Sequence, residues 1–157
     1  MSAAEARPMT SDAETRMKQV LERQKQAHIK EGPVSAEKRI EWLDRAIGLL
    51  VAHKEEITDA LREDFGSRSP DASMFTDVSG SIGPLKHAKA HLKTWMKREK
   101  RKVEPALLGL VGARSFIEYQ PKGTVGVISP WNFPFNLTFT PLAGLFGAGN
   151  REIIKPS

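Results

Sequence analysis

The sequence predicts an α/β fold in which a group of N-terminal helices precedes the start of a parallel sheet. Apolar residues recur at helical spacing through most of the chain before residue 102. The later run TVGVI (124–128) is rich in β-branched residues without alternation, which is typical of a strand buried on both faces. An apolar stretch (135–146) and the run REIIK (151–155) follow it. Strand, helix and strand in this order predict a β-α-β unit with a right-handed crossover.

Capping residues and helical periodicity predict three amphipathic helices before residue 66. Ser11 and Glu14 have the spacing of a capping box at the start of the first helix. Ser35 is the expected N-cap of the second, and Gly66 is expected to end the third. Each of these helices is expected to bury one apolar face.

A fourth helical stretch follows a turn, in which Ser69 or Asp71 is the expected N-cap. Gly80, Gly83 and Pro84 fall in the middle of this stretch. Because these residues weaken a helix, we expect a kink or a break there. Beyond Pro84 the helical pattern resumes, and we expect a packed helix with a basic outer surface. The region after residue 102 is expected to be a loop (103–113) and then a strand (114–121).

The segment 86–102 concentrates the positive charge of the chain. The whole chain carries +5, but this segment holds eight of its 24 basic residues and only one acid, Glu99, so the segment carries +7 and the remainder −2. Trp95 is expected on the apolar face of the helix, which leaves no exposed aromatic ring to stack on bases. We therefore expect a solvated helix face or an oligomer edge here. The alternative is a stand-alone helical binding module that uses this segment, for instance on nucleic acid.

The composition excludes several classes of site. The chain has no cysteine, so disulfides, thiolate metal sites and a cysteine nucleophile are absent from these 157 residues. His87 and His91 have the i, i+4 spacing of a helical zinc site, but no third ligand is evident and we expect no metal. Polar residues interrupt the apolar stretch 133–149, which is too short to span a bilayer. Residues 1–10 have no apolar core of a secretory signal, and we expect a cytoplasmic protein.

Polar residues follow directly after the first predicted strand. Ligands of open α/β sheets bind beyond the carboxyl ends of the strands, where Ser129, Pro130, Trp131 and Asn132 are placed. Pro130 and Pro134 restrict the backbone of this loop. The Asn132 amide is an uncharged donor that can stabilise an oxyanion as it forms. Alternatively, Asn132 satisfies backbone groups in a turn while Trp131 fills the core, and the spacing alone favours this simpler interpretation.

Lys155 ends the second predicted strand at the same edge of the sheet. Its ammonium group can reach a cofactor hydroxyl or phosphate, although a solvated strand end is the simpler interpretation. Gly123 and Gly126 do not form the G-x-G-x-x-G fingerprint of dinucleotide-binding loops. Glu152 lies within this strand, and an unpaired buried carboxylate there is destabilising or becomes neutral.

The stretch GTVGVISPWNFPFNLTFTPLAGLFGAGN, followed by IIKPS, resembles the aldehyde dehydrogenase family. The match is nearly continuous over 121–157, and ITDALREDFGSRS and HLKTWMK are similar to N-terminal helices of that family. The resemblance covers roughly residues 12–157 and is strongest to the coniferyl aldehyde dehydrogenases, a branch related to the class 3 enzymes.

This resemblance implies an aldehyde dehydrogenase-like fold in three parts. A flexible stretch (1–10) precedes an N-terminal helical region (11–102) and the incomplete start of a Rossmann-like NAD(P)-binding domain (103–157). The implied activity is oxidation of coniferyl or a related aromatic aldehyde to the carboxylic acid with NAD or NADP. The implied full-length enzyme is a homo-oligomer with neither nucleic acid nor membrane as a partner.

The resemblance also assigns roles to individual residues. It implies that Asn132 helps to hold the oxyanion formed when a cysteine thiolate attacks the aldehyde, and that Lys155 binds the adenosine ribose. The residues that it places along the cofactor cleft are Ser129, Pro130 and Trp131.

Two departures from the family pattern accompany the resemblance. The nucleophilic cysteine, the general-base glutamate and a second nucleotide-binding loop of the family lie beyond Ser157. The chain is therefore expected to be the N-terminal third of the enzyme and to be inactive alone. Glu152 stands where the family usually has an apolar residue.

Overall fold

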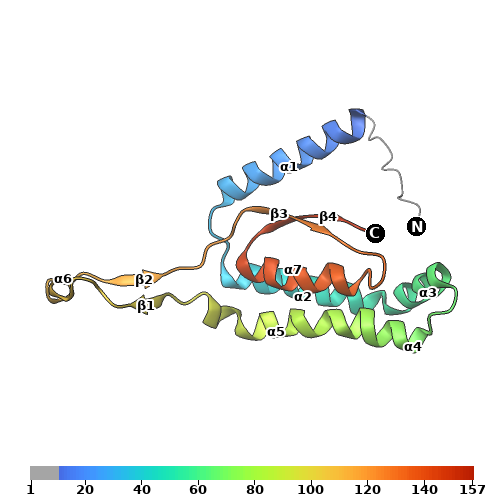
Figure 1. Ribbon diagram of the computed structural model, residues 1–157. Helices are drawn as coiled ribbons and strands as arrows, with labels where there is room; N and C mark the ends of the chain where they lie inside the picture. The colour runs from blue at the N-terminus through green and yellow to red at the C-terminus, as the bar shows by residue number, and fades with distance from the viewer. Residues whose placement is uncertain (1–10) are drawn as a thin grey trace, which may run out of the picture.

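The computed structural model describes residues 11–157, which form a layer of helices, a two-stranded parallel sheet and a projecting hairpin (Figure 1). A π-helical segment, Met74–Ser79, joins α4 to α5. The helices are α1 (Ser11–Glu31), α2 (Ala36–Ala52), α3 (Lys54–Phe65), α4 (Pro70–Ser73), α5 (Gly80–Trp95), α6 (Ala106–Leu110) and α7 (Asn136–Ala148). The strands are β1 (Glu99–Arg101), β2 (Ser115–Ile117), β3 (Thr124–Ile128) and β4 (Arg151–Lys155).

The apolar core lies where α2, α5 and α7 pack side by side (Figure 1). Leu43 and Leu50 from α2 and Leu85 from α5 are fully buried in one cluster, which Ala143 of α7 completes. Burial of each leucine side chain stabilises the folded state by about 1.5–3 kcal/mol relative to leaving it exposed to water. This cluster fixes α7, and therefore the loop that leads into it, against the helical layer.

Most of the expected helix caps are confirmed. The Ser35 hydroxyl accepts the amide of Lys38 at 3.2 Å at the start of α2. Ser69 rather than Asp71 caps α4, since its hydroxyl accepts the Ala72 amide at 3.1 Å. Gly66 ends α3 with a φ of 69°, a conformation that other residues adopt with strain. α1 begins at Ser11, but the Ser11 side chain lies outside the described residues, so its capping box stays a prediction.

Of the kink or break expected at Gly80–Pro84, the break is wrong. Residues 70–95 are helical throughout, and Pro84 lies inside α5. The irregularity is instead the π-helical segment, which ends just before Gly80. A Cβ atom on Gly80 would lie 2.5 Å from the Nδ2 atom of Asn136 on α7, so this glycine permits close approach of two helices. Its role is packing between helices and not termination of one.

The β-α-β unit is confirmed. β3 pairs with β4 in parallel, with Thr124 opposite Arg151 and Ile128 opposite Lys155, and α7 connects the two strands. Burial of β3 on both faces is not observed, since Val127 is buried but Ile128 is 79% exposed. α7 covers one face of this sheet, whereas on the other face, within residues 11–157, α1 is the helix that contacts β3 and β4 (Figure 1).

Helix α7 is also less buried than its apolar composition suggests. Leu142, Ala143 and Gly147 are buried, but Leu137 remains exposed. The buried residues belong to the faces that meet α2, α5 and the sheet. Residues 135–146, apolar nearly all round, predict a buried helix, and this is only partly observed because an apolar sequence does not itself supply neighbours on every side.

A narrow hairpin projects from the body of the molecule (Figure 1). β1 and β2 pair antiparallel, with Glu99 opposite Ile117, and α6 forms the tip. The expected loop 103–113 thus contains a short helix, and the expected strand 114–121 is shorter than predicted. Large apolar side chains are exposed along the hairpin and its exit: Leu107, Leu108, Leu110, Val111, Phe116, Ile117 and Tyr119.

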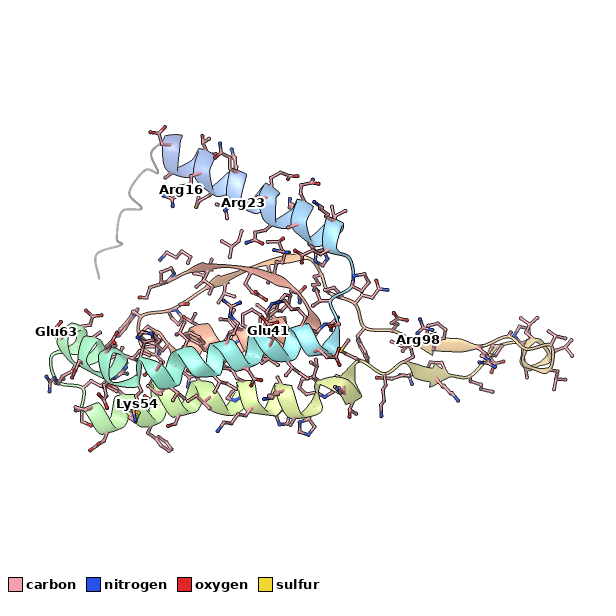
Figure 2. All side chains as sticks on the ribbon, turned by 180° about the vertical axis from the view of Figure 1, so that it is seen from behind. Arg16, Arg23, Glu41, Lys54, Glu63 and Arg98 are labelled. Atoms are coloured by element: carbon pink, nitrogen blue, oxygen red, sulfur yellow. The ribbon has the colours of Figure 1, made fainter. Side chains whose placement is uncertain are left out.

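The basic segment 86–102 pairs mostly with acidic residues that lie outside it. Lys89 pairs with Asp44 at 2.6 Å, and Arg98, at the base of the hairpin in Figure 2, pairs with Glu118 at 2.6 Å. Three further cations of the segment have acidic partners: Lys93 with Glu37, Arg101 with Glu99, and Lys102 with Glu104. The isolated charge of the segment therefore overstates the positive charge of this surface.

The sequence suggests that Trp95 lies on the apolar face of α5, but in the structure this residue is partly exposed. It is 45% exposed, and its ring stacks on that of His91 with centroids 5.8 Å apart. Trp95 is the last residue of α5, and its ring meets α7 only near the end of that helix, at Gly147.

Among residues 11–157, no helix combines the length and the apolar character that a membrane span requires.

Candidate functional site

The carboxyl ends of β3 and β4 lie side by side and form the edge at which the site residues gather. Ile128 and Lys155, the last residues of the two strands, are register partners. The Ser129 amide donates to the Lys155 carbonyl at 3.0 Å, which extends the pairing by one bond. The loop 129–135 starts from this edge and leads into α7. Lys155, a candidate from the sequence, is exposed beside the beginning of this loop.

The first three loop residues differ in their surroundings. Ser129 is buried, and its hydroxyl forms a hydrogen bond with the Thr138 hydroxyl of α7, which ties the loop to the helix. Pro130 is exposed. Trp131 is 71% exposed, with its ring centroid 6.3 Å from that of Phe65. The alternative in which Trp131 fills the core is therefore wrong, and its exposed indole lies beside Phe65 of α3.

Asn132 presents its amide without a partner within residues 11–157. The residue is exposed, and its backbone carbonyl accepts a hydrogen bond from Arg68 Nη2 at 2.7 Å. The turn hydrogen bonds that the simpler interpretation of Asn132 requires are not observed for its side chain. Arg68 thus fixes the backbone of Asn132, while the two N–H donors of its side-chain amide stay free for a ligand.

Two charged residues that sequence reasoning passed over contact this loop. Asp77, in the π-helical segment, is fully buried, and its Oδ1 atom accepts the amides of Phe135 and Asn136 at 3.1 and 3.2 Å. Arg68, in the connection between α3 and α4, lies 3.4 Å from the Oδ2 atom of Asp77. One signal was available, because Asp77 shares the apolar helix face of Met74 and Leu85, where an acid is unexpected.

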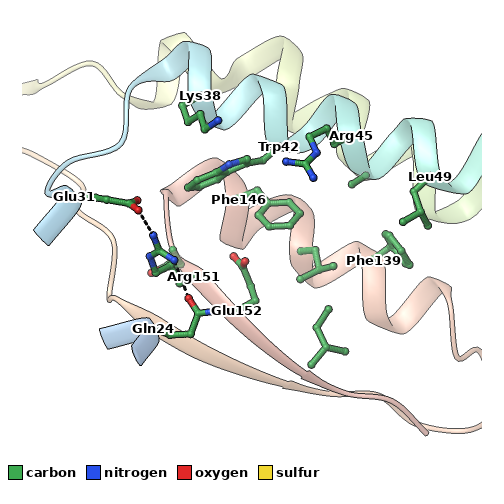
Figure 3. A pocket seen from close by; sticks show the side chains of 14 residues that line it. Gln24, Glu31, Lys38, Trp42, Arg45, Leu49, Phe139, Phe146, Arg151 and Glu152 are labelled. Carbon is green, nitrogen blue, oxygen red and sulfur yellow. Dashed lines mark hydrogen bonds and ion pairs between the residues drawn. The ribbon is translucent and has the colours of Figure 1, made fainter. Parts of the chain in front are cut away.

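Glu152 faces a separate cavity of about 590 Å³ between α1, α2, α7 and β4 (Figure 3). Trp42 and Phe146 line it, and the Oε1 atom of Glu152 is buried without a hydrogen-bond partner. Burial raises the pKa of Glu152 to about 7, against a smaller opposite effect of the positive charge on Arg151. Arg151 itself pairs with Glu31 at 2.5 Å. Glu152 thus has a carboxylate oxygen without a partner, but the residue is only partly buried.

The paired histidines do not assemble a metal site with other residues of the described chain. The rings of His87 and His91 stack with centroids 4.2 Å apart, and His91 Nδ1 lies 2.9 Å from the His87 carbonyl oxygen. No group of three or more histidine, cysteine or acidic side chains suited to a metal ion occurs within residues 11–157. The His91 nitrogen that faces this carbonyl is thereby occupied in a contact within α5.

Comparison with known proteins gives matches over nearly the whole chain. A model of the aldehyde dehydrogenase family matches residues 5–157. The chain is 64% identical over 150 residues to the probable coniferyl aldehyde dehydrogenase of Caulobacter vibrioides, which covers 95% of this chain and 31% of that protein. It is 47% identical over 137 residues to the coniferyl aldehyde dehydrogenase of a Pseudomonas species, covering 87% of this chain and 27% of that protein.

Solved structures show the same likeness. The substrate-bound state of Staphylococcus aureus AldH superposes with a TM-score of 0.81 at 30% identity, covering 90% of this chain and 30% of that chain. Glyceraldehyde-3-phosphate dehydrogenase GapN from Methanocaldococcus jannaschii, complexed with NADP, gives a TM-score of 0.77 at 24% identity over 99% of this chain and 32% of that chain, and shows the fold alone. The chain spans less than a third of the length of the curated relatives described above.

Proposed function

Because this chain belongs to the aldehyde dehydrogenase family, we propose that it supplies the N-terminal part of an enzyme that oxidises an aldehyde to a carboxylic acid with NAD or NADP. Coniferyl or a related aromatic aldehyde is the proposed substrate. The names of the two relatives that are 64% and 47% identical to this chain support that choice. The 157 residues contain no cysteine, so the attacking thiolate has to come from elsewhere in the enzyme and the chain alone is inactive.

One observation carries this proposal: the Asn132 amide has no partner on a loop that is anchored at the carboxyl edge of a parallel sheet. A neutral donor in a fixed position can donate a hydrogen bond to the aldehyde oxygen as negative charge develops there. The donor does not have to reorganise at that moment. The proposed role of Asn132 is therefore to donate to the oxyanion that forms when a thiolate attacks the aldehyde. Pro130 and Pro134, on either side, limit the freedom of the loop.

The same edge fits a dinucleotide. Lys155 is exposed at the end of β4, and Trp131 has an exposed indole ring in the loop that follows β3. A cation with three donors suits the hydroxyl groups of a ribose, which is the role proposed for Lys155. Ser129, Pro130 and Trp131 are proposed to line the cleft beside it. When bound there, NAD or NADP supplies the hydride acceptor.

The proposed full-length enzyme is a cytoplasmic homo-oligomer with no nucleic acid or membrane partner. The exposed apolar hairpin 99–117 supports an oligomer, because such surfaces mark protein contacts more often than they stay in water. Binding of nucleic acid through segment 86–102 is disfavoured because four of its eight cations pair with acids outside the segment and a fifth pairs with Glu99 inside it. Neutralised cations release fewer counterions from a phosphate backbone.

Substitution of Asn132 in the full-length enzyme tests the proposal. We expect Asn132→Ala to lower kcat by roughly 10²–10³, because it removes one oxyanion donor, and to leave the affinity for NAD or NADP nearly unchanged. The assay is formation of the reduced cofactor with coniferyl aldehyde and simpler aldehydes. Gln26→Ala, which removes an exposed amide from α1, is the control. A normal kcat for Asn132→Ala contradicts the role of the amide.

A further inference from the structure

We propose that Arg68 and Asp77 are positioning residues for the loop 129–135, and that they set the place from which the Asn132 amide acts. This inference rests on the proposed function of Asn132. It also assigns a task to two residues that contact no reacting atom.

Asp77 holds the helical end of the loop. Its carboxylate is fully buried, and its Oδ1 atom accepts two backbone amides, from Phe135 and Asn136. These amides belong to the first turn of α7, where N–H groups have no partner within the helix. A carboxylate also interacts favourably with the positive end of the helix dipole. Because both bonds go to consecutive amides, they fix the direction in which the chain enters α7.

Arg68 holds the middle of the loop. Its Nη1 atom faces Asp77 Oδ2 at 3.4 Å, while Nη2 donates to the Asn132 carbonyl at 2.7 Å. The guanidinium carbon lies 4.0 Å from the Phe65 ring centroid and 5.0 Å from that of Phe133. Two aromatic rings and an acid therefore orient one planar cation, a geometry that lysine cannot reproduce. The cation acts on the backbone of Asn132 and leaves its side-chain amide free.

The π-helical segment completes the contact with α7. The Asn136 side chain donates from Nδ2 to the Thr76 carbonyl at 2.6 Å, and the Thr76 hydroxyl donates to Asp77 Oδ2 at 3.0 Å. Close approach at this point requires Gly80, whose absent Cβ would overlap Asn136. Wider helical winding of this kind is frequent at functional sites. The loop and the first residue of α7 are thus anchored at 132, 135 and 136 by residues 58 to 64 positions earlier in the chain.

A purely structural role for these contacts makes a different prediction from a positioning role. A structural contact lowers stability when it is removed, but the folded fraction of the enzyme keeps its kcat. A positioning contact lowers kcat in the folded enzyme, because a displacement of about 1 Å of a catalytic group costs up to about 10²-fold in rate. A donor that acts only in the transition state changes kcat with little effect on KM.

The experiment compares Arg68→Ala, Arg68→Lys and the matched control Arg62→Ala in the full-length enzyme. Arg62 is an exposed arginine of α3 that forms its ion pair with Asp59 and does not touch the loop. We expect Arg68→Ala to lower kcat about 10- to 100-fold at nearly constant KM, and Arg68→Lys to restore little of it. Arg62→Ala keeps the normal kcat. Circular dichroism and urea unfolding establish that each variant is folded under the assay conditions.

A double-mutant cycle with Asn132→Ala decides whether Arg68 acts through that residue. In the Asn132→Ala background, Arg68→Ala is expected to lower kcat by less than about twofold. The reason is that two residues that act through the same amide do not have additive effects. Full additivity, or a normal kcat for Arg68→Ala, overturns the inference. If Arg68→Ala fails to fold, Asp77→Asn replaces it. Asp77→Asn keeps an oxygen acceptor for the Phe135 and Asn136 amides and loses the ion pair, and a normal kcat for it is equally decisive.

These outcomes separate the inference from the proposal on which it rests. A normal kcat for Asn132→Ala overturns both the oxyanion role and the positioning of that amide. A slow Asn132→Ala enzyme together with a normal Arg68→Ala enzyme overturns the positioning role alone.

Discussion

Replacement of Glu152 by glutamine is expected to stabilise the protein at alkaline pH and to have no such effect at acidic pH. The Glu152 carboxyl lies at a cavity lined by Trp42 and Phe146, and its Oε1 atom has no partner (Figure 3). Burial raises its pKa from 4.5 to about 7, with the positive charge of Arg151 opposing the shift. The proton is therefore held more tightly in the folded state than in the unfolded state.

The sign and size of the effect follow from this difference. Between about pH 4.5 and pH 7 the folded state binds more protons than the unfolded state, so the free energy of unfolding falls as pH rises through this window. A pKa of about 7 in place of 4.5 corresponds to at most about 3 kcal/mol, at about 1.36 kcal/mol for each tenfold change in proton affinity. Glu152 is only partly buried, and screening by solvent reduces this to about 1–2 kcal/mol.

The assay is urea unfolding of the full-length protein at pH 4.5 and at pH 8. We expect the free energy of unfolding of Glu152→Gln to be about 1–2 kcal/mol higher than that of the wild type at pH 8. At pH 4.5, where the wild-type carboxyl is protonated, we expect the two values to be equal. Glu152→Val is expected to be stabilising at pH 8 for the same reason. Glu63→Gln, at an exposed position of α3 (Figure 2), is the control. If the free energy of unfolding depended on pH equally in Glu152→Gln and in the wild type, the reasoning would be refuted and the carboxylate would be solvated or paired.

Three further predictions concern the 157-residue chain itself. The purified chain is expected to form no reduced cofactor with NAD or NADP and any aldehyde, because it lacks a cysteine, and measurable turnover contradicts this. It is expected to be poorly soluble or to bind hydrophobic dyes, since β4 has an unpaired edge and Ile128 is exposed; a sharp cooperative melt of a monomer is the opposing result. Labelled DNA and RNA are expected not to bind segment 86–102 at near-physiological salt, and submicromolar binding there would favour the stand-alone module.

Local signals in the sequence predicted the elements of the fold well. Ser35, Ser69 and Gly66 mark helix ends because caps depend on hydrogen bonds and backbone angles within a few residues. The β-α-β unit was predictable because β-branched residues and the intervening apolar helix lie in one short stretch. The resemblance to the aldehyde dehydrogenases is confirmed by the family match over residues 5–157, and the fold by structures with TM-scores of up to 0.81.

Predictions that depended on neighbours distant in sequence were less successful. Gly80 indicated a break when read along the helix, but its lack of a Cβ serves contact with Asn136 of α7. The charge of segment 86–102 was read without Asp44 and the other acids that pair with it from outside the segment. Trp95 was assigned to the core from helical spacing, which gives the direction of a side chain but not whether another element covers it.

For the candidate site, the sequence by itself determined the chemical groups: an uncharged amide at Asn132, an ammonium at Lys155 and two prolines that stiffen the loop between them. The tertiary structure alone decided the register in which the Ser129 amide donates to the Lys155 carbonyl, and that the Asn132 amide is free. It also decided that Arg68 and Asp77 hold the loop from 58 to 64 residues away. Periodicity and capping report interactions within one element. A hydrogen bond between residues so far apart exists only once the core has brought their helices together, because the packed neighbours, and not the local chain, set the distance between donor and acceptor.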